Sequence, residues 1–365
     1  MTAVPDLLYS ADEDALRSGV RDLLAERSPH PAVLARIETD TPYDPDLWHA
    51  LAAQIGVTGL AVPEPYGGAG ASWHETAVVA EELGRSVAPT PFLGSAVLAT
   101  AALLALDHRL LGTLAAGETT ATLVIPLSMP PDARFPDTVR ADGALTGSVT
   151  SVADALTADV LLVPAVGGGG PTLSAVAREQ AAVTRVVSLD ATRPLADVAF
   201  DGASGELLAS GPEAERAVAA AVAAGAAMLA SEQLGLAEQC LESTVAYLED
   251  RHQFGRPVGS FQALKHRLAD VWVSITQARA AARYAAACLS SGAPDTPVAV
   301  AVAASYCAET AVHAAEECLQ LHGGIGFTWE HPAHLYLKRA KADALALGAP
   351  HRHRAALGPL VDLTL

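Results

Sequence analysis

The stretch RHQFGRPVGSFQ, from Arg251 to Gln262, decides how the rest of the sequence is interpreted. It follows a long apolar helical pattern, contains glycine and proline, and brings two guanidinium groups close together in sequence. Arginine can grip a pyrophosphate through paired hydrogen bonds, and the amide of Gln262 can complete such a site without adding charge. The alternative is a polar turn between two helices, with the arginines paired to Glu249 and Asp250. On residue types alone, the polar turn is the commoner meaning.

A second segment, QLHGGIGF, runs from Gln320 to Phe327 at the end of another helical pattern. Three glycines in four positions allow the backbone to approach a flat ligand closely. Glycines of this kind are also the usual way to end a helix. Alone, this segment therefore identifies no ligand.

The pattern along the chain is helical, then β, then helical, and it predicts an α+β fold. Apolar spacing and a Ser10 cap predict N-terminal helices over 11–26, 47–55, 72–87 and 93–114. Short β-rich runs between 118 and 210 predict a small antiparallel β domain, in which 167–171 is a hairpin connection. Helices over 212–250, 262–289, 296–321 and 331–347 predict a C-terminal four-helix bundle. We expect domains at 1–117, 118–210 and 211–365.

Composition narrows the classes of partner and the location. The formal charge of −18, from 41 acidic and 23 basic residues, repels polyanions and argues against nucleic-acid binding. The N-terminal stretch MTAVPDLLYSADEDAL has no basic region followed by an apolar run, so a cytoplasmic location is expected. The longest apolar stretch, 217–230, is too short and too rich in alanine for a membrane span. The four cysteines lack CxxC spacing, which predicts buried thiols and no metal site.

Several segments together, in this order, resemble the acyl-CoA dehydrogenase family across nearly the whole chain. GLAVPEPYGGAG followed by VVAEELGRSVAPTP resembles the N-terminal helical domain of that family, and SLDATRPLADVAFDG resembles the closing strands of its β domain. RHQFGRPVGSFQALKHRLAD and LQLHGGIGF resemble its C-terminal bundle. No single piece is specific, but the combination is.

The resemblance implies that FAD binds across a subunit interface. In the family, the residues corresponding to Arg251, Gln253, Phe254 and Gln262 reach the FAD of a neighbouring subunit. Those corresponding to Gln320, Gly323 and Gly324 line its adenosine and pyrophosphate portion. The implied reaction is α,β-dehydrogenation of an acyl-CoA thioester, in which a carboxylate takes the α-proton and flavin N5 accepts the β-hydride. An electron-transferring flavoprotein would reoxidise the flavin.

The sequence departs from the family pattern at the catalytic base. Family members carry a glutamate either near the end of the fourth C-terminal helix or on the first long helix just before an arginine. Those positions read Leu347-Gly348-Ala349 and Gly225-Ala226 here. A leucine cannot accept a proton, so no residue of this chain is assigned a catalytic role.

The predicted β domain departs from the family pattern as well. The flavin-holding Thr-Glu-Pro-x-x-Gly-Ser-Asp stretch of the family is replaced by IPLSMPPDARFPD over 125–137. The strand that carries a tryptophan in the family reads GSVTSVA over 147–153, without an aromatic residue. The lost residues serve a flavin held by the same subunit, whereas the retained ones serve a neighbour's flavin. This division suits an α2β2 heteromer, a form that the family includes for steroid side-chain CoA thioesters in actinobacteria, with the base supplied by a second dehydrogenase subunit.

Other interpretations stay open. Glu232 lies on the first long helix, two turns beyond the alternative glutamate position, and could serve as the base of a self-sufficient homotetramer, although a structural role is favoured. A non-catalytic stabilising subunit, or oxidase or monooxygenase chemistry on the same scaffold, would also fit. The basic group near the C-terminus either meets CoA phosphates or a partner, or complements acidic neighbours; its members are Lys338, Arg339, Lys341, Arg352 and Arg354.

Overall fold

The first helix shows why the N-terminal region folds as predicted. In this computed structural model, which describes residues 6–41 and 43–363, Ser10 Oγ accepts a hydrogen bond from the Glu13 amide. The Glu13 carboxylate accepts one from the Ser10 amide in return, so both ends of a capping box are made. The helices of this region are α1 (Ala11–Arg27), α2 (His30–Ile37), α3 (Pro45–Ala50), η1 (Leu51–Ile55), η2 (Val57–Gly59), η3 (Glu64–Tyr66), α4 (Trp73–Ser86), η4 (Phe92–Ala99), α5 (Thr100–Leu104) and α6 (Leu110–Ala115). The predicted N-terminal helices are confirmed except the last.

The single helix expected over 93–114 is wrong, because the chain breaks between α5 and α6. Asp107 takes a left-handed backbone conformation with φ of 51°. The hydroxyl of Tyr66 donates to the backbone and side-chain oxygens of Asp107, which fixes the turn. Tyr66 and Asp107 are 41 residues apart in sequence, so the spacing of apolar residues could not predict their contact at the break.

The sheet follows the predicted β-rich runs but is mixed rather than antiparallel. Its strands are β1 (Ala121–Leu123), β2 (Val139–Ala141), β3 (Leu145–Ala153), β4 (Val160–Gly167), β5 (Gly170–Ala177), β6 (Ala182–Val186), β7 (Leu195–Ala203) and β8 (Glu206–Ser210). The order is β6-β7-β3-β2-β4-β5-β8, with β1 also on β4. Both β1 and β2 pair with β4 in parallel. β3 runs antiparallel to β2, and the chain then reverses again into β4. Because β4 lies beside β2 and not beside β3, β2 and β4 run in the same direction.

The glycine run after β4 forms the hairpin connection that the sequence predicts. Gly167 pairs with Gly170 in the antiparallel β4–β5 ladder, so the chain reverses at the two glycines between them. Gly170 has a φ of 98°, a conformation that L side chains rarely adopt. The segment is a tight turn that connects β4 to β5.

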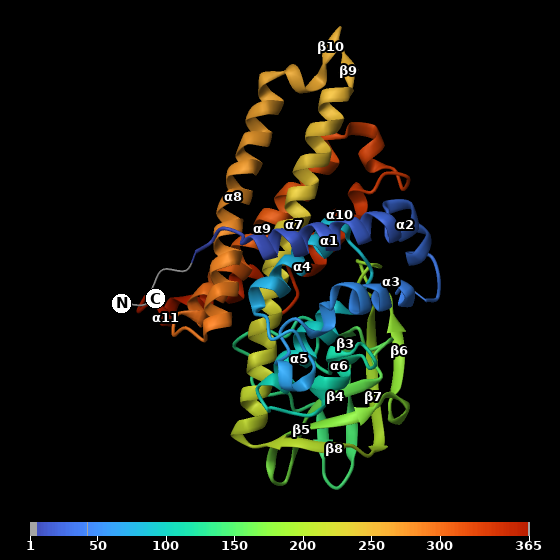
Figure 1. Cartoon of the computed structure of the whole chain (residues 1–365), viewed down its shortest axis with the longest axis vertical. Helices are drawn as coiled ribbons and strands as arrows, with labels where there is room; N and C mark the ends of the chain where they lie inside the picture. Colours follow the sequence, from blue (N-terminus) through green and yellow to red (C-terminus); the bar gives the residue numbers. More distant parts are fainter. Residues whose placement is uncertain (1–5, 42, 364–365) are drawn as a thin grey trace.

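Long helices build the C-terminal part. They are α7 (Pro212–Asp250), α8 (Gln262–Ser291), α9 (Thr296–Leu321), α10 (Ala333–Asp343) and α11 (Pro350–Leu360), with the short η5 (Arg178–Gln180), η6 (Val258–Ser260) and η7 (Gly323–Phe327) elsewhere in the chain. The four predicted helices are confirmed, and α11 is a fifth that the sequence analysis missed. α9 packs against α7, α8, α10 and α11. Figure 1 shows α7 and α8 extending beyond the other helices at one end, with the sheet at the opposite end.

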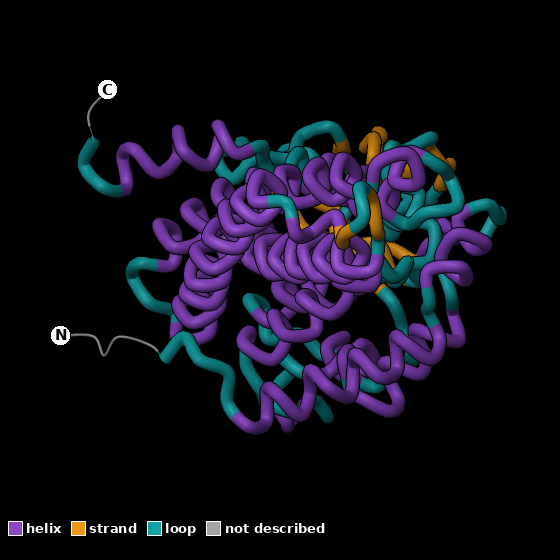
Figure 2. Tube along the Cα trace, turned by 90° about the horizontal axis from the view of Figure 1, so that it is seen from above, coloured by secondary structure: helices purple, strands orange, loops and turns teal. Residues whose placement is uncertain are grey.

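Two of these helices, α7 and α9, have the length and hydropathy of a membrane span. Within the bundle, however, 83% of the apolar window of α7 and 61% of that of α9 are buried. In Figure 2 the long helices lie at the centre of the molecule, with strands to one side. An apolar helix enclosed by other helices is the expected core of a globular fold.

Glu81 on α4 makes the stability of the folded chain depend on pH. The carboxylate is fully buried, accepts hydrogen bonds of 2.9 Å from Tyr9 and contacts Arg17 at 2.6 Å. Burial raises the pKa of Glu81 from 4.5 to about 7, although Arg17 opposes this. The folded chain therefore holds a proton that the unfolded chain releases, so stability falls as pH rises from about 4.5 to 7.

Replacing Glu81 with glutamine is expected to flatten this slope. At about 1.4 kcal/mol per pKa unit, the shift corresponds to roughly 3 kcal/mol lost between pH 4.5 and 8. Urea unfolding at pH 5 and pH 8 measures the loss in both proteins. Asp343, whose pKa burial also raises to about 7, keeps part of the slope in the variant. An unchanged difference between the two pH values would show that Glu81 titrates normally.

Candidate functional site

The stretch from Arg251 to Gln262 forms a β-hairpin between the two longest helices. Strands β9 (His252–Gln253) and β10 (Arg256–Pro257) pair in an antiparallel arrangement. Between them, Phe254 has a φ of 53° and Gly255 a φ of 75°. Two consecutive positive φ values make the two-residue turn that suits a hairpin. The Val258 amide donates to the Arg251 carbonyl at 2.7 Å and closes its base. Figure 1 shows this hairpin at the far tip of the molecule.

The side chains of the hairpin are directed to the surface and have few partners. Arg251, Gln253 and Gln262 are exposed, and Phe254 is 91% exposed. The guanidinium of Arg256 lies 3.9 Å from the centre of the Phe261 ring. Across residues 6–41 and 43–363, neither Arg251 nor Arg256 forms an ion pair. The expected alternative, in which they pair with Glu249 and Asp250, is therefore not what this structure contains.

The second predicted segment forms the end of α9 and the short helix η7. Gln320, Gly323 and Gly324 are exposed. A Cβ atom added at either glycine would meet no atom within 4 Å, so this backbone borders open space. Gly323 has a φ of 61°, which explains why a glycine ends the helix here.

An aromatic stack joins these two segments at the same end of the bundle. The Tyr247 ring in the last turn of α7 lies 4.6 Å from the His322 ring at the end of α9. The Arg251 amide donates to the Tyr247 carbonyl at 2.9 Å. The hairpin and the glycine segment therefore share one end of the molecule, although 69 residues separate Arg251 from Gln320.

Sequence analysis predicted the buried thiols but missed the contact between one of them, Cys318, and His322 in this stack. The Sγ of Cys318 lies 3.6 Å from His322 Nδ1, and all four cysteines are free and buried, as predicted. A hydrogen bond from Cys240 and the neighbouring His322 lower the pKa of Cys318 to about 4, against the effect of burial. Burial lowers the pKa of His322, but its hydrogen bonds with Cys318 raise it overall. The four-residue spacing of Cys318 and His322 on one helix was the available signal.

The two positions where a catalytic glutamate was expected lie against each other. Leu347 is fully buried, and its δ-methyl stands 2.5 Å from where a Cβ of Gly225 would be. A δ-methyl of Leu98 from η4 stands 2.6 Å from the same point. Hydrocarbon therefore fills the space that either glutamate would occupy. Of the described residues at these two positions, Gly225 and Leu347, neither side chain can accept a proton.

Glu232 lies in a buried ion network and is not a free base. Its carboxylate contacts Arg193 at 2.6 Å, and it pairs with Arg339 as well. Burial raises the pKa of Glu232, but the two guanidinium groups lower it overall. The network continues from Arg193 to Asp343 and from Arg339 to Asp190. It joins the β6–β7 connection to α7 and α10, which favours the structural interpretation of Glu232.

The basic residues near the C-terminus are paired with neighbours. Lys341 contacts Glu316 at 2.7 Å, Arg352 contacts Asp132 at 2.6 Å and Arg354 contacts Glu309 at 2.7 Å. Arg339 is in the buried network, and the Lys338 ammonium lies 4.3 Å from the Trp329 ring. These contacts favour the interpretation that the group complements acidic neighbours.

Residues 10–118 match the model of the acyl-CoA dehydrogenase N-terminal domain, and residues 215–358 match that of the acyl-CoA dehydrogenase C-terminal domain. The acyl-CoA dehydrogenase IpdE2 of Mycolicibacterium smegmatis is 36% identical over 342 residues, which cover 93% of this chain and 96% of that protein. The chain belongs to the acyl-CoA dehydrogenase family.

Two solved structures are similar to this chain over almost their whole length. The Tcur3481–Tcur3483 steroid acyl-CoA dehydrogenase variant superposes with a TM-score of 0.85 at 29% identity, covering 96% of this chain and 98% of that one. The ChsE4–ChsE5 complex of Mycobacterium tuberculosis gives a TM-score of 0.86 at 26% identity, covering 99% and 100%. Members of the acyl-CoA dehydrogenase family depend on FAD as their cofactor.

Proposed function

We propose that this chain is one subunit of a heteromeric acyl-CoA dehydrogenase and that it completes the flavin site of a partner subunit. The observation that carries the proposal is a division between two parts of the chain. The hairpin end keeps exposed, unpaired side chains suited to an anionic cofactor, whereas both positions for a base hold hydrocarbon. A subunit of this kind can contribute to a site without containing the reacting groups.

The residues of the hairpin end fit the FAD of a neighbour. Arg251 is exposed and without a carboxylate partner among the described residues, so its guanidinium is free to bind a pyrophosphate. Gly323 and Gly324 leave the backbone open to a flat group. Gln253, Phe254, Gln262 and Gln320 complete the proposed set. When bound, FAD would accept the hydride of the dehydrogenation.

The sheet does not fit a flavin of this chain's own. Strand β3 contains no aromatic residue that could pack against an isoalloxazine ring. Ile125 and Leu127 begin the stretch 125–137, which replaces the family's flavin-holding motif, and both are buried in the core. We therefore assign the missing half of the flavin pocket, together with the catalytic base, to the partner subunit.

Exposed aromatic side chains support a partner at the hairpin end. Phe254, Phe327 and Trp329 are 91%, 66% and 72% exposed, and Trp272 on α8 is 59% exposed. Large apolar groups clustered at a surface commonly mark a protein interface. The names of the structural neighbours describe a steroid enzyme and a two-protein complex, which supports an α2β2 assembly acting on steroid side-chain CoA thioesters. An electron-transferring flavoprotein would reoxidise this cytoplasmic enzyme.

Activity of the chain with and without its partner tests the proposal. We expect the purified chain to give no dye reduction with acyl-CoA thioesters, and the co-expressed pair to be active. Substitution of the partner's catalytic glutamate by glutamine should abolish the activity of the pair. Dye reduction by the chain alone, lost on Glu232→Gln, would instead support a self-sufficient homotetramer. The ion pairs of Glu232 with Arg193 and Arg339 argue against that result.

A further inference from the structure

A pair of buried thiols joins α7 to α9 and has no role in the proposed function. Cys240 on α7 is 1% exposed, and Cys318 in the last turn of α9 is 2% exposed. The Cys240 thiol donates a hydrogen bond to the Sγ atom of Cys318. The packing of the two helices therefore brings together two sulfur atoms that are 78 residues apart in the sequence.

Polar side chains contact the Cys318 sulfur besides Cys240. His322 Nδ1 lies 3.6 Å from this sulfur, and Ser243 Oγ on α7 lies 3.8 Å from it. The same Nδ1 lies 2.7 Å from the Cys318 carbonyl, which only accepts, so Nδ1 carries a proton. The hydrogen bond from Cys240 and the contact with His322 hold the pKa of Cys318 at about 4, although burial opposes them. These groups stabilise the thiolate form of Cys318.

The two thiols of the pair differ in reactivity. Burial raises the pKa of Cys240 well above its usual value, and the neighbouring Cys318 raises it further, so Cys240 keeps its proton. The thiolate is the nucleophilic form of cysteine, so Cys318 is the attacking sulfur and Cys240 is a second sulfur beside it. Cys307 on the same helix has a different environment. Its Sγ donates to the Ala278 carbonyl at 3.5 Å, and burial raises its pKa to about 12.

We propose that Cys318 and Cys240 form a redox site, in which hydrogen peroxide oxidises Cys318 and Cys240 then closes a disulfide between α7 and α9. In the first step the Cys318 thiolate attacks one oxygen of the peroxide, the O–O bond breaks, and hydroxide is released from a sulfenic acid on Cys318. In the second step Cys240 loses its proton and attacks the Cys318 sulfur, and the S–O bond breaks to release water. The two sulfurs together lose two electrons, and the peroxide gains them.

The burial of the pair determines which class of oxidant can reach it. Hydrogen peroxide is small and uncharged, and it can enter when the end of the helix bundle opens locally. A bulky, charged disulfide reagent needs a much larger opening to reach the same sulfur. The expected oxidant is therefore a peroxide and not a partner in thiol–disulfide exchange.

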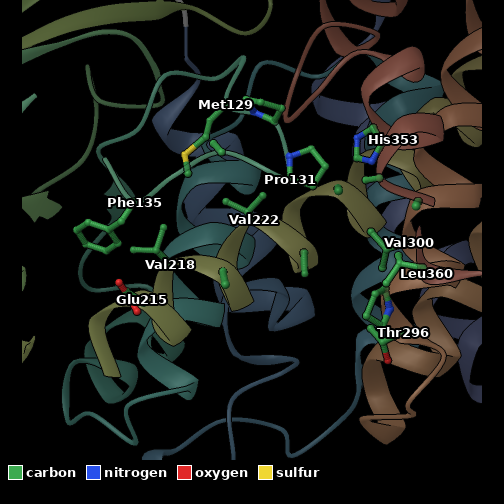
Figure 3. Close-up of a pocket in the computed structure, with 18 of the residues that line it drawn as sticks. Met129, Pro131, Phe135, Glu215, Val218, Val222, Thr296, Val300, His353 and Leu360 are labelled. Atoms are coloured by element: carbon green, nitrogen blue, oxygen red, sulfur yellow. The ribbon is translucent and has the colours of Figure 1, made fainter. Parts of the chain in front are cut away.

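The disulfide would constrain the hairpin end of the molecule. Figure 3 shows an apolar cavity beside the first half of α7, and of the described residues that line it, none is a cysteine. Val222 at this cavity precedes Cys240 by 18 residues, roughly 27 Å along the helix, whereas Arg251 follows Cys240 after 11 residues, roughly 16 Å. The His322 ring also stacks on Tyr247 beside the hairpin. Oxidation would therefore act on the helix ends beneath the hairpin and not on the cavity.

Peptide mapping of the full-length chain after treatment with hydrogen peroxide tests the proposal. The reduced protein, in the assembly it forms, would be treated with peroxide, denatured, alkylated without reductant and digested. We expect two of the four cysteines to escape alkylation, and the peptides that contain Cys240 and Cys318 to appear joined, with the loss of two hydrogen atoms from their summed mass. Reductant should restore all four thiols. Alkylation of all four cysteines, or a cross-link through Cys288 or Cys307, would overturn the pair.

Serine substitutions separate the two steps. Cys240→Ser removes the second thiol, so a sulfenic acid on Cys318 should accumulate and react with dimedone. Cys318→Ser should abolish the oxidation of Cys240, whereas Cys307→Ser on the same helix is the matched control and should leave the cross-link unchanged. Absence of a dimedone adduct in Cys240→Ser, or oxidation of Cys240 in Cys318→Ser, would overturn Cys318 as the attacking sulfur. None of these outcomes depends on the proposed flavin site.

Discussion

Replacing Arg251 with alanine in the assembled complex is expected to weaken FAD binding by roughly 10- to 100-fold. A charge-assisted hydrogen bond to a phosphate contributes about 1.5–3 kcal/mol, and paired bonds lie at the upper end. Arg251 is exposed and makes no ion pair among the described residues, so its loss should leave the fold intact. Flavin fluorescence during dilution of the complex measures the change in affinity.

Two further substitutions make this result specific. Arg216→Ala removes an exposed arginine from the opposite end of α7 and should not change FAD affinity. Arg251→Lys keeps the charge but loses the planar fork, so it should recover only part of the affinity. If FAD occupancy and turnover survive Arg251→Ala, the chain is a non-catalytic stabilising subunit whose side chains do not reach the flavin.

Replacing Gly235 with alanine is expected to destabilise the chain by about 3 kcal/mol or more. A Cβ at Gly235 on α7 would overlap the carbonyl oxygen of Glu81 on α4, and one at Gly84 on α4 would overlap the carbonyl oxygen of Glu232. These reciprocal contacts bring the two helix backbones together with no space for a methyl group. Overpacking at a backbone contact forces the helices apart, which costs more than an ordinary core insertion. Chemical denaturation measures the loss.

Gly225→Ala on the same helix is the matched control. The two atoms closest to its Cβ would be δ-methyl groups of Leu347 and Leu98, at the ends of flexible side chains and not on the backbone. Alanine also favours the helix by about 1 kcal/mol over glycine. Gly225→Ala should therefore cost much less than Gly235→Ala. Equal costs at both positions would mean that the α4–α7 contact can relax and that backbone proximity does not determine stability here.

The sequence predicted the helical elements well because their signals are local. The Ser10 cap, Pro212 at a helix start and the apolar spacing of α7 and α9 lie within the elements that they specify. The break at Asp107 and the parallel pairing of β1 and β2 with β4 depend on partners far away in sequence. Local patterns do not report such partners, and α11 was missed because its apolar face is short and contains Pro359.

The sequence predicted which residues form the candidate site, but it did not predict how they are arranged in space. The motifs named Arg251 and the two glycines of η7, and their roles toward FAD stay a prediction, as do the domain boundaries at 117 and 210. No motif indicated that Gly225 and Leu347 would adjoin, because they are 122 residues apart in sequence. The same applies to the ion pairs of Glu232, which arise from the packing of helices that contain no distinctive pattern.

The ratio of FAD to protein in the purified complex tests the central claim most directly. The complex would be formed by co-expressing this chain with a complete dehydrogenase partner, and flavin absorbance would be compared with the amount of each chain. A flavin site shared between two subunits predicts one FAD per pair of chains and no flavin on this chain alone. Two FAD molecules per pair, or yellow protein from this chain by itself, would contradict it.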